Sequence, residues 1–558
     1  MGVAVAAVEG SRRRVLCVFA RYTKTFGTFH HAYQFFPDTV AFMPPQGILT
    51  VASYVREKRP DWEVRFVDEN VRIPTDEEYR WADVVIASGM HVQRNHLAAI
   101  AERAHGAGKI AILGGPSVSA CPEYYPTFDV LHVGELGDAT DEILRHLDRS
   151  VARPDKQLVF TTNERLALDD FPIPAYDQID FNHYFVVNIQ WSSGCPFTCE
   201  FCDIPELYGR NPRLKSPERM LRELDAIAAR EPFGAVYFVD DNFIGNKKAA
   251  KKLLPHLIEW QKKTGYRLRF GAECTLNLAQ DDEILEMMRE AYFTDIFFGI
   301  ESPDEDTLDT IDKGQNIRIP LLDAIKKINS YGIELHAGII LGLDNDGEDT
   351  ADKVLKFIHE ANIPLLAINI VYALPKTPMW RRLEKEGRLI PTAQVEESNV
   401  IFKLPAATVL AQWKRVITEA YTPENLYRRY RHNIEHTYGN RKKLPVKAHH
   451  LSPRMLRIGL YSMAAIFLKL GLKARYKTAF RKMAMELLAS GRVDHLIYIA
   501  SMGHHLLRYA EEVRDGDVLA CFYTEKVLEL HDRGRRPLVD WEELLGRDNK
   551  PARPQHVA

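Results

Sequence analysis

The 558-residue sequence has few cysteines and no long uncharged apolar run, and each scarcity argues against a class of protein. Seven cysteines, an odd number, are too few for a secreted disulfide scaffold and suit a reducing compartment. No run of 18 or more uncharged apolar residues exists, so we expect no membrane-spanning helix. The apolar residues 3–8 follow no basic segment, so we expect no signal peptide and predict a cytoplasmic protein.

The net charge is also small, at −3, so the molecule as a whole offers no electrostatic attraction for nucleic acid. The charge is unevenly distributed. Residues 401–558 contain 28 Lys and Arg against 16 Asp and Glu, a net charge of +12 that leaves −15 for residues 1–400. We therefore expect no nucleic-acid partner, whereas the basic third suits an anionic partner, a membrane surface or the acidic body of the same chain.

Residues 1–150 alternate short apolar runs with helical patterns. This alternation predicts an α/β fold with a Rossmann-like parallel sheet, which binds ligands beyond the carboxyl ends of its strands. No Gly-x-Gly-x-x-Gly follows the first strand, which disfavours a dinucleotide. The expected strands are 13–20, 64–69, 83–89, 109–115 and 130–134, and the expected helices are 47–58, 92–106 and 138–148.

A second series of strands and helices follows a proline-containing linker at 151–184. Its six strand–helix repeats predict a partial (β/α)6 barrel over 185–400, with its chemistry at the carboxyl ends of the strands. Residues 401–558 are predicted to form a mostly helical C-terminal domain. The expected barrel strands are 185–192, 235–241, 267–273, 295–302, 334–343 and 365–374, and the helices between them are 217–230, 247–263, 281–292, 319–331 and 350–361.

Three cysteines gather directly after the first of these strands. Cys195, Cys199 and Cys202 have the spacing Cys-x₃-Cys-x₂-Cys, which places three thiolates on one loop, as three corners of a cubane iron–sulfur cluster require. A structural zinc site, the alternative, nearly always has four ligands, yet residues 203–255 contain no Cys or His. The pattern favours a metal with one open position, which the amino and carboxylate groups of a bound molecule can chelate.

This loop, with Phe201 as the aromatic residue before the last cysteine, resembles the radical S-adenosylmethionine (SAM) superfamily. The resemblance implies a [4Fe–4S] cluster, reductive cleavage of SAM to a 5′-deoxyadenosyl radical, and an external electron donor of the flavodoxin or ferredoxin type. Phe201 would contact the adenine. For the other positions the resemblance implies SAM contacts at strand ends, where the alternative is a helix cap or a surface acid; these are Asp240, Asp241, Asn242, Glu273, Glu301, Ser302 and Gly338.

A parallel sheet ahead of such a barrel resembles the cobalamin-binding class of the superfamily. The signature Asp-x-His-x-x-Gly is absent, and His91 and His96 lack its spacing, which implies cobalamin without a protein histidine below cobalt. The alternative is a Rossmann-like domain that binds a nucleotide or nothing. The strand-end residues that would contact cobalamin are Met90, His91, Gly114, Gly115, Pro116, Ser117, Gly134 and Glu135.

The C-terminal third contains an apolar helical segment at 455–472, interrupted by Arg457 and Lys469 and followed by further basic residues. It suits either an interfacial helix on anionic lipid or a buried helix with snorkelling ends, so 455–482 is a candidate for peripheral contact at the inner membrane surface. A helical region after the barrel resembles the subgroup that includes hopanoid C-2 methylases and enzymes of chlorophyll precursors. His504 and His505 are adjacent on a helix and receive no metal role.

The resemblance implies an enzyme that methylates an unactivated carbon of a hydrophobic small molecule or lipid. The resemblance implies that the methyl group comes from cobalamin. One alternative is a radical cyclase or oxidase that uses the same cofactors on a tetrapyrrole-like substrate. Another, of a different class, is a cobalamin-binding sensor with a structural metal site.

Overall fold

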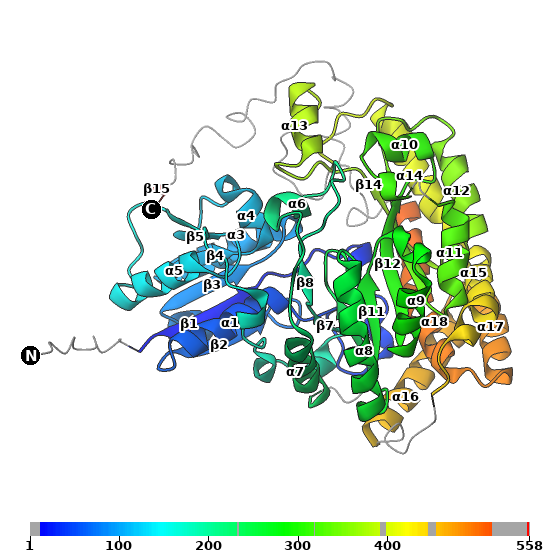
Figure 1. Ribbon diagram of the computed structural model, residues 1–558, viewed down its shortest axis with the longest axis horizontal. Coiled ribbons are helices and arrows are strands. Elements are labelled where there is room, and N and C mark those ends of the chain that lie inside the picture. The colour runs from blue at the N-terminus through cyan, green and yellow to red at the C-terminus, as the bar shows by residue number, and fades with distance from the viewer. Residues whose placement is uncertain are drawn as a thin grey trace, which may run out of the picture. The chain divides into compact units, whose positions relative to one another are not determined.

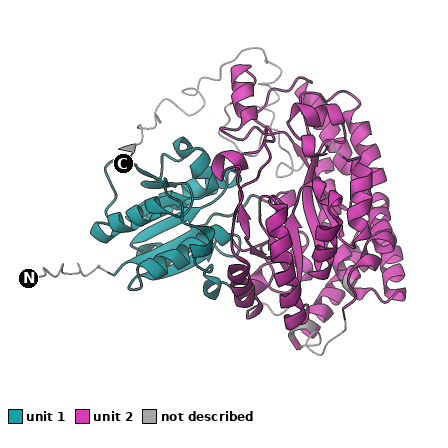
Figure 2. Cartoon of the chain, viewed as in Figure 1, with its two compact units in different colours: residues 1–23, 45–180, 546–558 teal, residues 24–44, 181–545 magenta. Residues whose placement is uncertain are grey.

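The computed structural model describes residues 12–230, 234–316, 319–390, 398–444, 453–515 and 555–556. The chain forms two compact units (Figure 2): unit 1 comprises 1–23, 45–180 and 546–558, and unit 2 comprises 24–44 and 181–545. The three-domain division expected from the sequence, with a linker at 151–184 between the first two domains, stays a prediction. The α/β fold with two parallel sheets is confirmed.

Unit 1 contains a parallel sheet of order β15-β6-β5-β4-β3-β1-β2 (Figure 1). Every strand predicted for this part of the chain is present within one or two residues. Strand β6 (Leu158–Thr161) lies in the predicted linker and pairs with β5. The other elements are β1 (Arg14–Phe19), β2 (Glu63–Asp68), β3 (Val84–Ser88), β4 (Ile110–Gly114), β5 (Val130–Val133), β15 (Gln555–His556), α1 (Gln46–Lys58), α2 (Asp76–Trp81), α3 (Arg94–Gly106), α4 (Pro116–Ala120) and α5 (Asp138–Arg149).

Helices cover both faces of this sheet because successive strand residues point to opposite sides. Val15 and Cys17 of β1 belong to a buried cluster with α1 and α5, whereas Leu16 and Val18 belong to a second cluster with α3. Strand β1 lies between β2 and β3. The strand order therefore reverses at β1, because β2 is added on one side of it and β3 on the other. In open α/β sheets, the crevice beyond such a switch point is the usual ligand site.

Unit 2 is built on a six-stranded parallel sheet of order β14-β13-β12-β11-β10-β7. Helices alternate with these strands as predicted, and Figure 1 shows them along the sheet. The order runs from one edge strand, β7, to the other, β14, which agrees with a partial barrel. The elements are β7 (Val187–Ile189), β10 (Gly234–Phe238), β11 (Leu268–Glu273), β12 (Phe293–Glu301), β13 (Glu334–Leu341), β14 (Leu365–Ile370), α7 (Pro217–Ala228), α8 (Lys247–Thr264), α9 (Asp282–Glu290), α10 (Glu305–Thr310), α11 (Leu321–Ser330) and α12 (Thr350–Ala361).

Beyond β14, helices dominate unit 2, as the sequence predicted. Helix α14 packs against α12 and β14, and α18 packs against α14, α15, α16 and α17. Within the described ranges, no helix combines the length and apolarity that crossing a membrane requires. These helices are α13 (Pro378–Lys385), α14 (Ala406–Ala420), α15 (Pro423–His436), α16 (Pro453–Ile466), which continues as a π-helix at Phe467–Lys473, α17 (Lys477–Ala489) and α18 (Val493–Asp515).

One buried carboxylate joins the barrel to the C-terminal helices. Glu334, at the start of β13, is 1% exposed and accepts hydrogen bonds from Tyr438 (2.5 Å) and Tyr498 (3.1 Å). Burial opposes its ionisation, but His336 at 3.3 Å and the charge of Arg441 outweigh burial and lower the pKa of Glu334. The carboxylate therefore stays charged at neutral pH and holds polar groups from distant parts of the chain.

Replacing Glu334 is expected to destabilise the protein strongly. Glu334→Leu removes the shared partner of two tyrosine hydroxyls and one imidazole, so we expect a loss of about 3 to 5 kcal/mol in the free energy of unfolding. The exposed Glu384 on α13 provides the matched control, because Glu384→Leu should change stability by less than about 0.5 kcal/mol. Urea denaturation measures both, and equal stability of the two variants would contradict the role of Glu334.

Candidate active site

The cysteine loop begins directly after strand β8 (Ser192–Ser193), which pairs with β9 (Arg213–Leu214) as an antiparallel ribbon closing the base of the loop. Gly194 has φ +100°, and a Cβ there would lie 2.8 Å from the carbonyl oxygen of Gly209. Any larger residue would be strained and would clash. The turn into the loop therefore depends on glycine.

Two carboxylates at the end of β10 hold the entry to this loop. Asp240, 1% exposed, accepts hydrogen bonds from the backbone N–H groups of Trp191 (2.9 Å) and Ser192. Asp241 accepts one from the N–H of Gly194 at 2.7 Å. Both acids were predicted as SAM contacts, and the structure adds a positioning role, because they fix the backbone from which Cys195 projects.

The three cysteines lie on this loop with their side chains partly exposed. Burial raises the pKa of Cys195 and raises that of Cys202 to about 12, so free thiols here would be protonated at neutral pH. A bound metal favours the thiolate form and removes that cost. Three sulfurs on one loop fit three corners of a [4Fe–4S] cluster, with one iron left for another ligand.

A segment more than a hundred residues away also contacts the loop. After α10 the chain turns back, and the Gln315 side-chain amide donates to the Sγ of Cys199 at 3.3 Å. The backbone N–H of Glu200 donates to the carbonyl oxygen of Ile311 at 3.0 Å. Nothing in the local sequence marks residues 311–316 as part of the site, and sequence reasoning missed them.

Glu301, a predicted SAM contact, forms a buried ion pair with Lys313 from the same segment. The Lys313 ammonium also lies over the ring of Phe201, 5.4 Å from its centroid. Glu301 has φ +64°, and a Cβ at Gly299 would overlap its carboxylate. The Gly-Ile-Glu-Ser turn therefore places Glu301 and Lys313 beside the aromatic residue of the cysteine loop.

The strand-end acids form an electrostatically unfavourable cluster. Burial raises the pKa of Glu273, at the end of β11, to about 7, and the charges of Asp241 and Asp240 add to the shift. Burial also raises the pKa of Asp240 to about 7 despite its hydrogen bonds. A cationic ligand nearby would relieve this repulsion and lower both pKa values. The cluster therefore suits a molecule with an ammonium or sulfonium group.

The remaining predicted SAM residues have identified neighbours. Asn242 is buried, donates to the Thr275 hydroxyl at 3.1 Å and lies near enough to Cys195 to favour its thiolate form. Ser302 accepts from the N–H of Asp304 at 3.2 Å. Gly338, in β13, is paired with Gly299 and lies beside Glu301. The structure thus gathers Asn242, Gly338 and Glu301 around the loop, and their contacts to SAM stay predictions.

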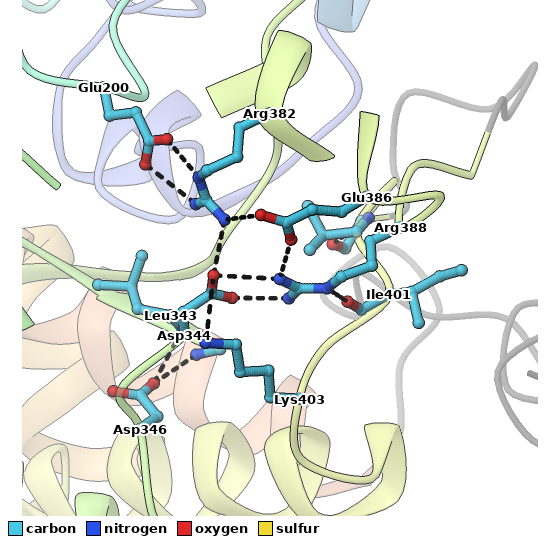
Figure 3. Close-up of polar contacts among 12 residues, drawn as sticks. Glu200, Leu343, Asp344, Asp346, Arg382, Glu386, Arg388, Ile401 and Lys403 are labelled. Atoms are coloured by element: carbon cyan, nitrogen blue, oxygen red, sulfur yellow. Dashed lines mark hydrogen bonds and ion pairs between the residues drawn. The ribbon is translucent and has the colours of Figure 1, made fainter. Parts of the chain in front are cut away.

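An ionic network braces the loop at Glu200, next to Cys199 (Figure 3). Arg382 of α13 makes a bidentate pair with the Glu200 carboxylate (2.5 and 3.0 Å) and contacts Asp344 at 2.7 Å. Burial would raise the pKa of Asp344, but Arg388 and Arg382 outweigh burial and lower it to about 2. Sequence reasoning missed this network, which ties the loop to α13 and to the turn after β13.

A cavity of about 220 Å³ adjoins the network at the carboxyl ends of β13 and β14. Gly342 must be glycine here, because it has φ +87° and a Cβ would lie 2.8 Å from the Phe402 ring. Polar and apolar groups both line the space, which suits a ligand of mixed character. The lining includes Ile311, Asp344, Met379, Arg382, Val400 and Lys403.

In unit 1, the predicted cobalamin residues surround the ends of β3 and β4. His91 hydrogen-bonds the Ser117 hydroxyl at 2.8 Å, and burial lowers its pKa to about 4, so it is neutral at pH 7. Gly115, which precedes Pro116, has φ +110°, and a Cβ there would lie 2.8 Å from the Ser88 hydroxyl. Gly115 therefore lets the β3 and β4 ends approach closely.

Met90 is 50% exposed beyond the switch point between β1 and β3. Gln93 accepts from its backbone N–H at 2.7 Å and donates to the carbonyl oxygen of Ala20, while the Tyr22 hydroxyl contacts the Met90 sulfur at 3.5 Å. The sequence did not indicate that Gln93 and Tyr22 contact this position, because neither belongs to a recognisable motif.

The outer cobalamin candidates lie further along the strand ends. Gly114 ends β4 and lies near His132, and Gly134 has φ +107° and packs against Thr162. Glu135 forms an ion pair with Arg165 at 3.1 Å. All these residues belong to the carboxyl ends of the sheet, and their cobalamin contacts stay predictions.

Two family models match the chain. The radical SAM superfamily model covers residues 189–358, which include the cysteine loop and most of the barrel. A domain of unknown function, DUF4070, covers 377–517, which include α13 and the C-terminal helices.

Full-length relatives extend this match. The chain is 50% identical to the hopanoid C-2 methylase of Rhodopseudomonas palustris over 93% of its own length and 97% of that protein's. It is 33% identical to an uncharacterized methyltransferase of Synechocystis sp., over 90% of this chain and 92% of that one.

Solved structures agree in fold. The cobalamin-dependent SAM radical enzyme OxsB, with aqua-cobalamin and SAM bound, matches with a TM-score of 0.57 at 15% identity, over 94% of this chain and 83% of that one. The radical SAM methyltransferase TsrM from Kitasatospora setae, with cobalamin and a [4Fe–4S] cluster bound, matches with a TM-score of 0.56 at 13% identity, over 90% and 99%. With the cysteine loop and the full-length identity, the chain belongs to the radical SAM superfamily, in the family that includes hopanoid C-2 methylase.

Proposed function

We propose that the protein is a cobalamin-dependent radical SAM methylase that adds a methyl group to an unactivated carbon of a hopanoid-type lipid. The observation that carries the proposal is the three-cysteine loop within a chain 50% identical to a hopanoid C-2 methylase along 97% of that relative. Because the chain belongs to a family of enzymes, the alternative of a cobalamin-binding sensor with a structural metal site has no support.

The residues present fit the cofactors that this reaction needs. Cys195, Cys199 and Cys202 would hold the [4Fe–4S] cluster, and the strand ends around Met90 and Gly115 would hold cobalamin. When bound, the cluster supplies the electron that cleaves SAM, and cobalamin supplies the methyl group. The fold shared with OxsB and TsrM supports a cobalamin domain in unit 1.

The chain's own residues would then position the reactants. Asp240 and Asp241 hold the loop backbone, and Gln315 donates to the Cys199 sulfur. Asp241 and Glu273 would attract the cationic groups of SAM, while Phe201, with Lys313 over its ring, would face the adenine. The ionic network at Arg382 would keep Glu200, and with it the loop, in place.

The cyclase alternative has weaker support. The anaerobic magnesium-protoporphyrin IX monomethyl ester cyclase of Rubrivivax gelatinosus is 23% identical over only 38% of this chain. The methylase relatives extend through the C-terminal helices as well, so the part of the chain most suited to substrate choice agrees with methylation.

A lipid substrate gives the exposed apolar face of α16 a use. Ser462 and Ile466 are buried, and Ser462 donates to the Phe35 carbonyl oxygen. The opposite face exposes Leu456, Leu460, Phe467, Leu468 and Leu472, with fractions from 43% to 63%. We propose that this face lies on an anionic membrane, since exposed basic residues flank it; these are Arg457, Lys473, Arg475, Lys477, Arg481 and Lys482.

Anoxic enzyme supplied with SAM, cobalamin, reductant and a hopanoid lipid should produce 5′-deoxyadenosine and a lipid heavier by one methylene. Cys199→Ala should lose more than about a hundredfold of both products, because it removes a cluster ligand. Cys121→Ala, outside the loop, should keep parent rates. Mass spectrometry measures both products, and deoxyadenosine without a methylated lipid would contradict the substrate or the methyl transfer.

We expect Gln315 to raise the reduction potential of the cluster. Its amide donates to a cluster sulfur, and such hydrogen bonds stabilise the more negative reduced state, so Gln315→Leu should lower the reduction potential by on the order of tens of millivolts. The proposed external donor, of the flavodoxin or ferredoxin type, would then reduce the cluster more slowly. Gln412→Leu, which removes another buried glutamine of unit 2, should leave the potential unchanged. Anaerobic redox titration followed by electron paramagnetic resonance measures the potential, and an unchanged value for Gln315→Leu would contradict the role.

The membrane proposal predicts co-flotation with vesicles that contain anionic phospholipid. Replacing both Leu460 and Phe467 by Asp should reduce bound protein at least about tenfold, since it puts charge into the apolar contact. Ile73→Asp, at a 45% exposed residue of unit 1, should bind like the parent. Equal flotation of the double variant and the parent would exclude this face as the contact.

A further inference from the structure

A histidine-rich cluster lies in unit 2 outside the proposed active site. Residues 24–44 pack against α18 although they lie far apart in sequence; His505 and Phe26, which are hydrogen-bonded, are 479 positions apart. His30, His31 and Glu512 each offer one potential ligand atom, and these three atoms lie within 4.8 Å of one another. All three side chains are partly buried, so the fold rather than chance surface proximity brings them together.

The hydrogen bonds already orient these groups. The Nδ1 of His30 bonds the Thr28 hydroxyl at 2.9 Å, which fixes the orientation of the ring. The Nε2 of His31 meets the Glu512 carboxylate at 2.6 Å. The bond from Thr28 to His30 is of the kind that orients metal-binding histidines, whereas the ion would replace the proton that His31 and Glu512 share. The rings of His30 and His31 lie 4.0 Å apart between centroids.

Two further imidazoles from α18 line the same space. The ring of His505 is 5.5 Å from that of His30 and 5.7 Å from that of His31. Burial lowers the pKa of His504 to about 3 and, with the nearby His31, keeps it neutral. His505 is fully buried, bonds the Phe26 carbonyl oxygen through Nε2, and leaves Nδ1 without a partner.

We propose that His30, His31 and Glu512 bind a divalent transition-metal ion of the Zn²⁺ type. Two imidazole nitrogens and one carboxylate are a known ligand set of zinc sites that keep an open position. The nitrogen content argues against Mg²⁺ and Ca²⁺, which prefer oxygen. The buried Nδ1 of the neighbouring His505 has no hydrogen-bond partner within the described part of the chain, and the rings of Phe26 and Phe29 pack against the His505 ring.

The ion would link residues 24–44 to α18 through ligands from both segments. Residues 24–44 also contact α16 and its π-helical continuation, because Ser462 and Lys469 donate to the carbonyl oxygens of Phe35 and Gln34, and α18 packs against α16. The proposed metal link would therefore stabilise the packing of α18 and of α16, which carries the exposed apolar face. It needs neither the cysteine loop nor cobalamin, so it stands apart from the proposed function.

Zinc is the probe of choice, because iron and cobalt already belong to the proposed cofactors. Anaerobically purified full-length protein, with its iron content measured, is dialysed against a small excess of Zn²⁺ and then against metal-free buffer. Plasma mass spectrometry should find about one zinc per chain, with unchanged iron. The same zinc should raise the melting temperature, since an ion that binds only the folded state stabilises it.

Variants locate the ion. His31→Ala and Glu512→Gln should each lose the retained zinc and the thermal shift while keeping the parent's iron; Glu512→Gln preserves the side-chain shape if His31→Ala folds poorly. His432→Ala is the matched control, because His432 and His436 on α15 form another close ring pair, 4.3 Å apart, but among the residues that the structure describes they belong to no such cluster of three. It should keep zinc.

Three results would overturn the proposal. One is a parent protein that retains no zinc. Another is full retention in both His31→Ala and Glu512→Gln. The last is loss in His432→Ala, which would assign the bound zinc to the pair on α15.

Discussion

Two carboxylates fix one turn of backbone, and the rest of the proposed active site depends on that turn. Asp240 accepts from the N–H groups of Trp191 and Ser192, and Asp241 accepts from that of Gly194, so the chain enters the cysteine loop in a single conformation. Three thiols then occupy one short loop, where burial raises the pKa of Cys195 and Cys202 and makes these two costly as free thiolates, a cost that a bound metal removes. Three protein ligands leave one iron of a cubane cluster open, and the proposed chemistry needs that vacancy.

The surroundings of the loop support the same use. The acids Asp240 and Glu273 are strained by burial and mutual repulsion, which a cationic cosubstrate relieves. On the other side, Gln315 and the Arg382 network hold the loop from the turns after α10 and β13. The family relation adds information on the substrate class, which the site alone does not give. The identity to a hopanoid C-2 methylase, a lipid methylase, covers nearly the full length of both chains and so includes the C-terminal helices.

Strand periodicity made the fold predictable, and parallel βα order placed the cysteine loop correctly at a strand end. Strand β6 escaped prediction, because a four-residue strand beside prolines resembles a linker. Gln315, Lys313 and Arg382 escaped because their contacts cross 112 to 182 residues of sequence, a distance that no local pattern reports. Likewise, His504 and His505 gave no signal alone, since their neighbours His30 and His31 lie at the other end of the chain.

The open iron is the central claim, and spectroscopy of the reduced protein tests it most directly. Anoxic protein reduced with dithionite should give the electron paramagnetic resonance signal of a [4Fe–4S]⁺ cluster. SAM labelled with ¹⁷O in its carboxylate or ¹⁵N in its amino group should add hyperfine coupling to that signal, because these groups bind the open iron. A reduced cluster without such coupling, or tetrahedral zinc on the three cysteines, would contradict the account.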